Sequence, residues 1–127
     1  MAENKVAEKK VVRVAAVQIA PDLDTLEGTL ARVLAALDEA AGKGAQLVVL
    51  PETFLPWYPY FSFVLPPVLT GAEHLRLYEQ AVTVPGPVTE AVSASARRLG
   101  VVVVLGVNER DHGSLSNTQL IFDADGS

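Results

Sequence analysis

Cysteine is absent from the 127-residue chain, and basic residues are few. The lack of cysteine excludes disulfide bonds, thiolate metal ligands and a cysteine nucleophile from these residues. Ten Lys and Arg against fifteen Asp and Glu give a net charge of −5. Because nucleic-acid binding needs a basic face, no nucleic-acid partner is expected. Half of the residues are hydrophobic, which is enough for about one domain with a buried core.

Glycine-rich phosphate-binding motifs and the common metal-binding motifs are missing as well. The sequence contains neither GxGxxG nor GxxxxGK[ST], and it has no HExxH motif or EF-hand loop. Its two histidines, His74 and His112, are isolated. A metal site needs three or four converging ligands, so none is expected.

The first ten residues and the one long uncharged stretch indicate where in the cell the protein is expected. Residues 1–10 are charged and lack the apolar core of a signal peptide, which favours a disordered tail and a cytoplasmic protein. Residues 53–72 carry no charge and reach the length of a membrane span. Four prolines interrupt this stretch and would break a spanning helix. We expect a buried or pocket-lining loop there, and no membrane partner.

Hydrophobic periodicity predicts a β-α-β unit in the first fifty residues. Residues 11–20 are mostly apolar and β-branched, typical of a strand covered on both faces. A capping box of Asp24 and Glu27 should open a helix that ends at Gly42 or Gly44. Its apolar stripe has helical spacing: Leu26, Leu30, Val33, Leu34 and Leu37. Residues 47–50 should form a second, parallel strand, which places Glu52 at the carboxyl edge of the sheet.

The second half is expected to continue the α/β order. The pattern predicts helices over residues 73–82 and 87–99, with Pro87 at a first helical position and Gly100 as a stop. A buried strand over 101–107, a polar turn over 108–113 and a half-buried strand over 117–122 should follow. Residues 123–126 read as a hairpin turn whose returning strand is missing. An unpaired last strand leaves an open edge, so we hypothesise the N-terminal part of a longer protein.

Glu52 is the residue whose surroundings suggest chemistry. It follows an apolar strand and precedes a loop with six of the eight aromatic residues: Phe54, Trp57, Tyr58, Tyr60, Phe61 and Phe63. A carboxylate enclosed by rings and prolines loses water, which favours its neutral form and suits a general base. Alternatively, Glu52 is a solvated loop residue or caps backbone amides. The aromatic cluster could equally be core or a subunit contact.

Four segments together resemble the nitrilases of the carbon–nitrogen hydrolase superfamily, most closely the bacterial aliphatic and arylacetonitrile-hydrolysing members. The segments are RVAAVQIAP (13–21), AAGKGAQLVVLPETFLPWYPY (40–60), VPGPVTEAV (84–92) and GVNERDHGSLSNTQLIFDADG (106–126). The resemblance covers residues 11–127. It implies an α/β fold, here a partial α-β-β-α sandwich without its C-terminal part.

The resemblance also implies a reaction. Family members use a Glu-Lys-Cys triad, in which the Cys thiolate attacks a nitrile carbon and water resolves the thioimidate to a carboxylic acid and ammonia. The Glu serves as general base for thiol and water, and the Lys stabilises developing negative charge. No cofactor is implied, the partner is a small-molecule nitrile, and assembly into homo-oligomers is expected.

Only part of that machinery matches this chain. Glu52 matches the triad Glu, and Tyr58, with Trp57 and Tyr60, lies in the segment that resembles the substrate-pocket wall. Asn108 and Glu109 resemble residues at a strand end near the site and are expected to support it, although they could form a solvated turn. No lysine matches and no cysteine exists, so the 127 residues alone are expected to be inactive.

Other interpretations remain open from the sequence. The main alternative is a non-catalytic remnant that pairs with a full-length homologue through its β edge and aromatic loop. A stand-alone flavodoxin-like binding domain has little support, because such sheets carry a phosphate-binding loop near a strand end. The preferred nitrile, an amide side product and the oligomer size are left undecided.

Overall fold

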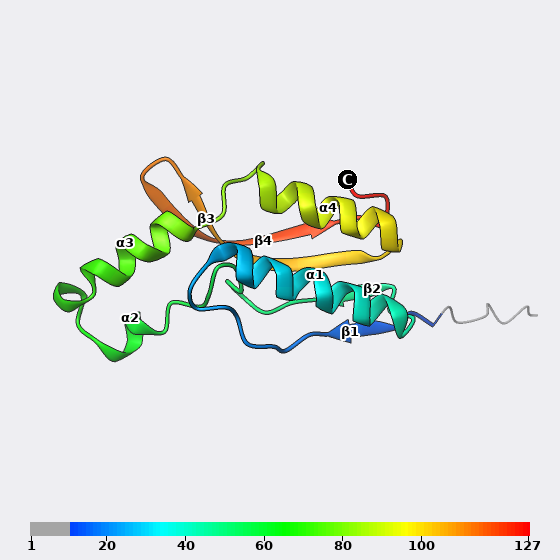
Figure 1. Cartoon of the computed structure of the whole chain (residues 1–127), viewed down its shortest axis with the longest axis horizontal. Helices are drawn as coiled ribbons and strands as arrows, with labels where there is room; N and C mark the ends of the chain where they lie inside the picture. The colour runs from blue at the N-terminus through cyan, green and yellow to red at the C-terminus, as the bar shows by residue number, and fades with distance from the viewer. Residues whose placement is uncertain (1–10) are drawn as a thin grey trace, which may run out of the picture.

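A computed structural model of the chain describes residues 11–127, which form a sheet with helices on one face (Figure 1). The tail expected over residues 1–10 lies outside the described residues. The elements, in chain order, are β1 (Val14–Ala16), α1 (Leu26–Gly42), β2 (Leu47–Val49), α2 (Phe61–Val64), the 3-10 helix η1 (Pro67–Leu69), α3 (Gly71–Gln80), α4 (Pro87–Leu99), β3 (Val102–Asp111) and β4 (Ser114–Phe122). This order confirms the expected α/β class.

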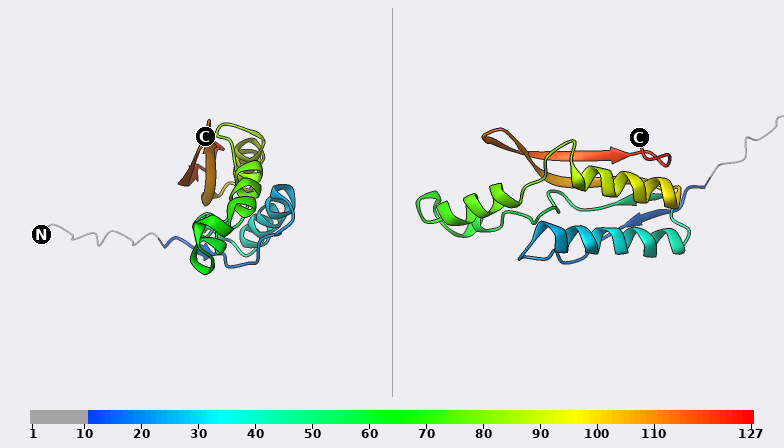
Figure 2. Two further views of the ribbon diagram at one scale, coloured as in Figure 1. Left: turned by 90° about the vertical axis from the view of Figure 1, so that its left-hand side faces the viewer. Right: turned by 45° about the horizontal axis from the view of Figure 1, so that its top comes forward.

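The sheet has the strand order β1-β2-β3-β4. β1, β2 and β3 are parallel, whereas β4 returns antiparallel to β3. The predicted β-α-β unit is therefore confirmed, with α1 as its crossover. Helices α1 and α4 lie along the same face of the sheet, and α2 and α3 extend beyond one end (Figure 2).

The two long helices bury the stripes that the sequence predicts. Val33 and Leu37 of α1 are fully buried, while Leu26, Leu30 and Leu34 are partly buried against the same core. α4 begins at Pro87 and is followed by Gly100, whose φ of 65° is left-handed, as expected. Both helices pack on alternate residues of β3, namely Val103, Leu105 and Val107, which are all fully buried.

The predicted capping box of α1 is wrong. Thr25, not Asp24, is the N-cap, and its hydroxyl accepts a hydrogen bond from the Gly28 amide at 3.0 Å. The Asp22 carboxylate accepts hydrogen bonds from the amides of Asp24 (2.8 Å) and Thr25 (3.1 Å). The pKa of Asp22 is lowered, first by the Asp24 amide, then by the Thr25 amide and, less, by the Arg32 charge.

The first strand also differs from expectation. Only Val14–Ala16 is strand, and it is covered on one face rather than on both: Ala15 packs against the core, whereas Val14 is 53% exposed. It lies at the sheet edge, and no described element covers its outer face. That uncovered face carries a row of apolar residues in register: Ala16, Val49, Val104 and Ile121. The apolar pattern of residues 11–20 predicted a strand, but it could not show which face of that strand other elements cover.

The long uncharged stretch divides into two parts. Residues 53–57 are buried, as expected for a pocket-lining loop, whereas residues 62–69 are exposed on α2 and η1. Of the helices in the described part of the chain, none is both long and apolar enough to cross a membrane. The cytoplasmic location stays a prediction.

Candidate functional site

Glu52 lies where the chain continues beyond β2 alongside β3 and bulges out of the sheet. Leu50 donates its amide hydrogen to the Val104 carbonyl at 2.9 Å, and Leu55 donates to the Gly106 carbonyl at 3.3 Å. Between these two ties, the backbone of residues 51–53 passes directly above Gly106. A methyl group on Gly106 would lie 2.3 Å from the Pro51 oxygen and 2.8 Å from the Glu52 Cα. Gly106 thus permits an approach that a side chain would prevent.

Behind Glu52 the loop is fixed by a buried amide and a strained residue. Asn108 is 6% exposed, and its Nδ2 donates to the carbonyl oxygens of Trp57 (2.9 Å), Thr53 (3.4 Å) and Leu55 (3.5 Å). Thr53 is buried with a φ of 42°, a left-handed conformation that costs a β-branched residue energy. The bend after Glu52 is therefore held by its surroundings rather than by its own preference.

The Glu52 carboxylate itself is exposed, so the expected desolvation is wrong for this chain. Four of the aromatic residues line the same pocket as Glu52 without burying its side chain, namely Phe54, Trp57, Tyr58 and Tyr60. Its Oε1 accepts a hydrogen bond from the Asn117 side-chain amide on β4, at 2.5 Å. Asn117 pairs with Asn108 across the two strands, so both lie on the sheet face opposite α1 and α4.

An open pocket of about 400 Å³ brings together Glu52 and the three predicted pocket residues. Its lining consists of Gln18, Ile19, Ala20, Pro21, Leu23, Pro51, Glu52, Phe54, Trp57, Tyr58 and Tyr60. We call it the Glu52 pocket. The wall is mostly apolar and aromatic, and Glu52 is its one acidic residue, which suits a small organic ligand with one reacting group.

The three aromatic residues contribute differently to this wall. Trp57 is buried, and the Arg76 guanidinium lies 4.9 Å from its ring centre. The Tyr58 ring is tilted against that of Tyr60 at 4.8 Å. Tyr60 is 71% exposed, so it stands at the rim and not in the core. Trp57 fits the core interpretation of the aromatic cluster, whereas Tyr60 does not.

Asn108 and Glu109 belong to β3 and not to a turn, so the expected polar turn over 108–113 is wrong. β3 continues to Asp111, and the chain reverses at His112 and Gly113. Successive strand residues face opposite sides, so Glu109 points away from Glu52 and its Oε2 accepts from the Thr118 hydroxyl at 2.7 Å. The structure brings Asn108 to the Glu52 loop and leaves Glu109 on the other face.

The sequence analysis missed three residues around Glu52, namely Gly106, Thr53 and Asn117. A lone glycine within the β-branched run VVVVLGV was a signal of close backbone approach. Asn117 carried no signal of its own, because its contact depends on the pairing of β3 with β4. The single lysine of residues 11–127, Lys43, pairs with Glu39 at the far end of α1.

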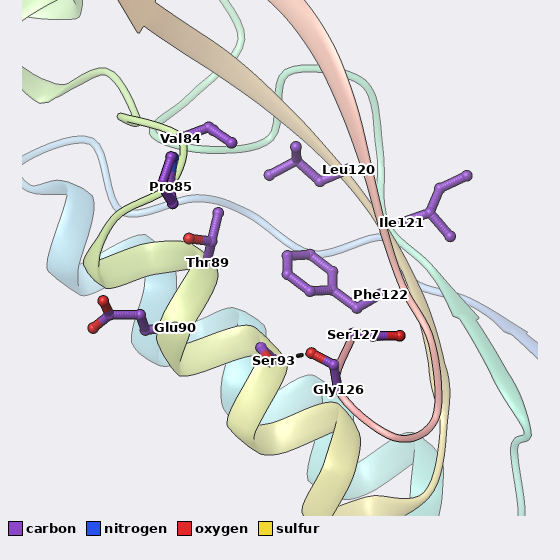
Figure 3. Close-up of a pocket in the computed structure, with 10 residues that line it drawn as sticks. All are labelled: Val84, Pro85, Thr89, Glu90, Ser93, Leu120, Ile121, Phe122, Gly126 and Ser127. Carbon is purple, nitrogen blue, oxygen red and sulfur yellow. Dashed lines mark hydrogen bonds between the residues drawn. The ribbon is translucent and has the colours of Figure 1, made fainter.

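A second hollow, of about 380 Å³, lies between α4 and β4 (Figure 3). Leu120 and Phe122 point toward α4, while Ile121 points to the other side of the strand. Ser93 donates a hydrogen bond to the Gly126 carbonyl at its floor. Glu90 is its one charged lining residue, and none of the predicted site residues reaches it. In the described residues, no group of three His, Asp or Glu could hold a metal ion.

Comparison with known proteins gives concordant results. Residues 13–127 match the family model described as carbon-nitrogen hydrolase. The chain is 71% identical over 120 residues to a nitrilase of Paraburkholderia phymatum, covering 94% of this chain and 35% of that protein. It is 39% identical over 115 residues to an aliphatic nitrilase of Rhodococcus rhodochrous, covering 90% and 31%. The chain therefore spans about a third of the length of these curated relatives.

Solved structures show the same fold. A CN-hydrolase superfamily protein from Xanthomonas campestris superposes with a TM-score of 0.68 at 24% identity, covering 91% of this chain and 38% of that one. An amidase from Nesterenkonia sp. gives 0.62 at 20% identity, covering 91% and 39%. The expected fold, part of a carbon–nitrogen hydrolase sandwich, is confirmed.

Proposed function

The chain belongs to the carbon–nitrogen hydrolase family, and from this premise we propose that it forms the Glu52-bearing third of a nitrilase. The complete protein would hydrolyse a small nitrile to a carboxylic acid and ammonia. The observation that supports this most is the Glu52 pocket, whose lining brings Glu52 together with Trp57, Tyr58 and Tyr60. The relatives named nitrilase match this chain over nine-tenths of its length.

In the proposed reaction, Glu52 is the general base. It would take the proton from a cysteine thiol supplied by the rest of the protein, and the thiolate would add to the nitrile carbon to form a thioimidate. Glu52 would pass that proton to the nitrile nitrogen, and would then take a proton from a first water as this water attacks the thioimidate carbon and ammonia leaves. A second water, activated in the same way, would hydrolyse the remaining thioester and release the carboxylic acid and the cysteine thiol. Trp57, Tyr58 and Tyr60 would hold the organic part of the nitrile.

The 127 residues should not complete this reaction alone. The chain has no cysteine, and Lys43, the lysine within the described residues, lies beside Glu39 at the amino end of β2. Nucleophile and charge stabiliser would both come from the remaining two-thirds of the protein.

A chimera tests the proposal directly. This chain replaces its aligned 120 residues in the Paraburkholderia phymatum nitrilase, whose remainder supplies the missing groups. We expect the chimera to release ammonia from nitriles, and Glu52→Gln to lower kcat by about 10²-fold to 10⁴-fold, the usual contribution of a general base. Glu90→Gln, an exposed glutamate beside the second hollow, is the matched control and should leave kcat unchanged. Equal effects of the two variants would refute the role of Glu52.

A second candidate is a non-catalytic chain that pairs with a homologue or with itself. The uncovered sheet face favours it, because Ile121 is 68% exposed on the edge strand β4. Exposed apolar residues of α2 and η1, such as Phe63 (74%) and Val68 (87%), could serve the expected homo-oligomer. Sedimentation of the chain with and without the Paraburkholderia phymatum nitrilase tests this candidate, since a stable mixed complex without added turnover would favour it.

A further inference from the structure

Asn117 makes the contact that holds the exposed Glu52 side chain. Its amide nitrogen donates to Glu52 Oε1 across 65 residues of sequence. An Asn Nδ2 has two hydrogens and only donates, and a carboxyl oxygen accepts, so the two groups are chemically matched. Without this contact, an exposed glutamate would sample several rotamers.

The pairing of β4 with β3 fixes the position of Asn117 relative to Glu52. β4 is paired with β3 through nine residues, from Val103–Phe122 to Asp111–Ser114. The backbone beneath Glu52 is fixed on the same β3 by Gly106 and by the buried amide of Asn108. The loop that carries Glu52 and the strand that carries Asn117 are thus both hydrogen-bonded to β3.

We propose that Asn117 is a positioning residue that fixes the direction of the Glu52 carboxylate beside the Glu52 pocket. The inference rests on the proposed function for its kinetic consequence but not for the contact itself. Loss of the donor should leave the aromatic wall intact and impair the proton transfer. Misplacing a reacting group by about 1 Å costs on the order of 100-fold in rate.

The contact is tested first on the full 127-residue chain by NMR. We expect one Asn117 side-chain amide proton to resonate downfield of free asparagine amides, and to move to the free position in Glu52→Ala. Gln46 is an exposed amide just before β2, at the opposite end of that strand from Glu52, so its signals should not respond and provide the control. An Asn117 signal at the free position that Glu52→Ala leaves unchanged would overturn the proposal.

The kinetic arm uses the chimera. Asn117→Ala should lower kcat by about 10-fold to 100-fold with KM within about twofold, and Asn117→Gln, which retains a donor, should recover part of the loss. Asn117→Asp conserves shape but brings a second carboxylate, so it should be no better than the alanine variant. Wild-type kcat in Asn117→Asp, or an equal loss in Gln46→Ala, would refute the positioning role. A chimera without turnover refutes the nitrilase proposal, while the amide signals still decide the Asn117 contact.

Discussion

Replacing Gly106 with alanine should damage both the stability of the chain and the aim of Glu52. The added methyl would meet the Pro51 oxygen at 2.3 Å, the Thr53 nitrogen at 2.6 Å and the Glu52 Cα at 2.8 Å. Restoring an ordinary contact requires the loop to lift by about 0.7 Å or more, because Cβ contacts below 3.0 Å essentially do not occur in well-packed proteins. All three obstacles are backbone atoms, so no rotamer change relieves the clash.

The expected cost of Gly106→Ala is about 1–3 kcal/mol of unfolding free energy, the range found for overpacked cores. Urea unfolding of the chain measures it. Gly113→Ala is the matched control, because nothing lies within 4 Å of a methyl group at that turn. Its effect should stay within about 0.5 kcal/mol, as for most surface substitutions.

In the chimera, the lifted loop should displace Glu52 and lower kcat by on the order of 100-fold. The reasoning is refuted if Gly106→Ala unfolds at the same urea concentration as Gly113→Ala. It also fails if the variant is destabilised while kcat is unchanged, since the loop would then tolerate the shift without moving the base.

Two further predictions concern the supports of the site. Asn108→Leu removes the donor of the buried Trp57, Thr53 and Leu55 carbonyls and should cost about 1–3 kcal/mol in urea unfolding. Asn108→Asp should be at least as harmful at neutral pH, because a carboxylate would face carbonyl oxygens, and near-wild-type stability of either variant would contradict this. The pKa of Asp22 is lowered from 3.8 in the folded chain, mainly by the Asp24 amide, so its stabilising effect is present above that pH and is lost as the pH falls through the folded value. Asp22→Asn should therefore lower the Tm near neutral pH and make progressively less difference below pH 3.8, and a Tm difference that does not change with pH would exclude this explanation.

The sequence predicted the parts of the fold that depend on local pattern. Apolar spacing located α1, and Pro87 with Gly100 bounded α4, because caps and stripes are properties of neighbouring residues. Parallel pairing of β1 with β2 followed from the crossover length. The environment of β1 was not predictable in this way, since exposure depends on what covers each face.

For the site, the sequence located Glu52 and the pocket wall but not their supports. Position 52 follows from the end of β2, a local feature. The exposure of its carboxylate and its bond to Asn117 depend on how a hairpin 65 residues away lies against the loop. Glu109 illustrates the same limit, because one residue along a strand reverses the side that it faces.

At Thr53, a gain in stability would conflict with the fixed direction of the Glu52 side chain. The Thr53 φ of 42° suits glycine or asparagine better than a β-branched residue, so a stabilising design would replace Thr53 early. Strain of this kind is worth about 1–3 kcal/mol. Thr53 directly follows Glu52, so a relaxed backbone at Thr53 would allow the Glu52 side chain to point in another direction. A more stable chain and a well-directed carboxylate are competing goals at this bend.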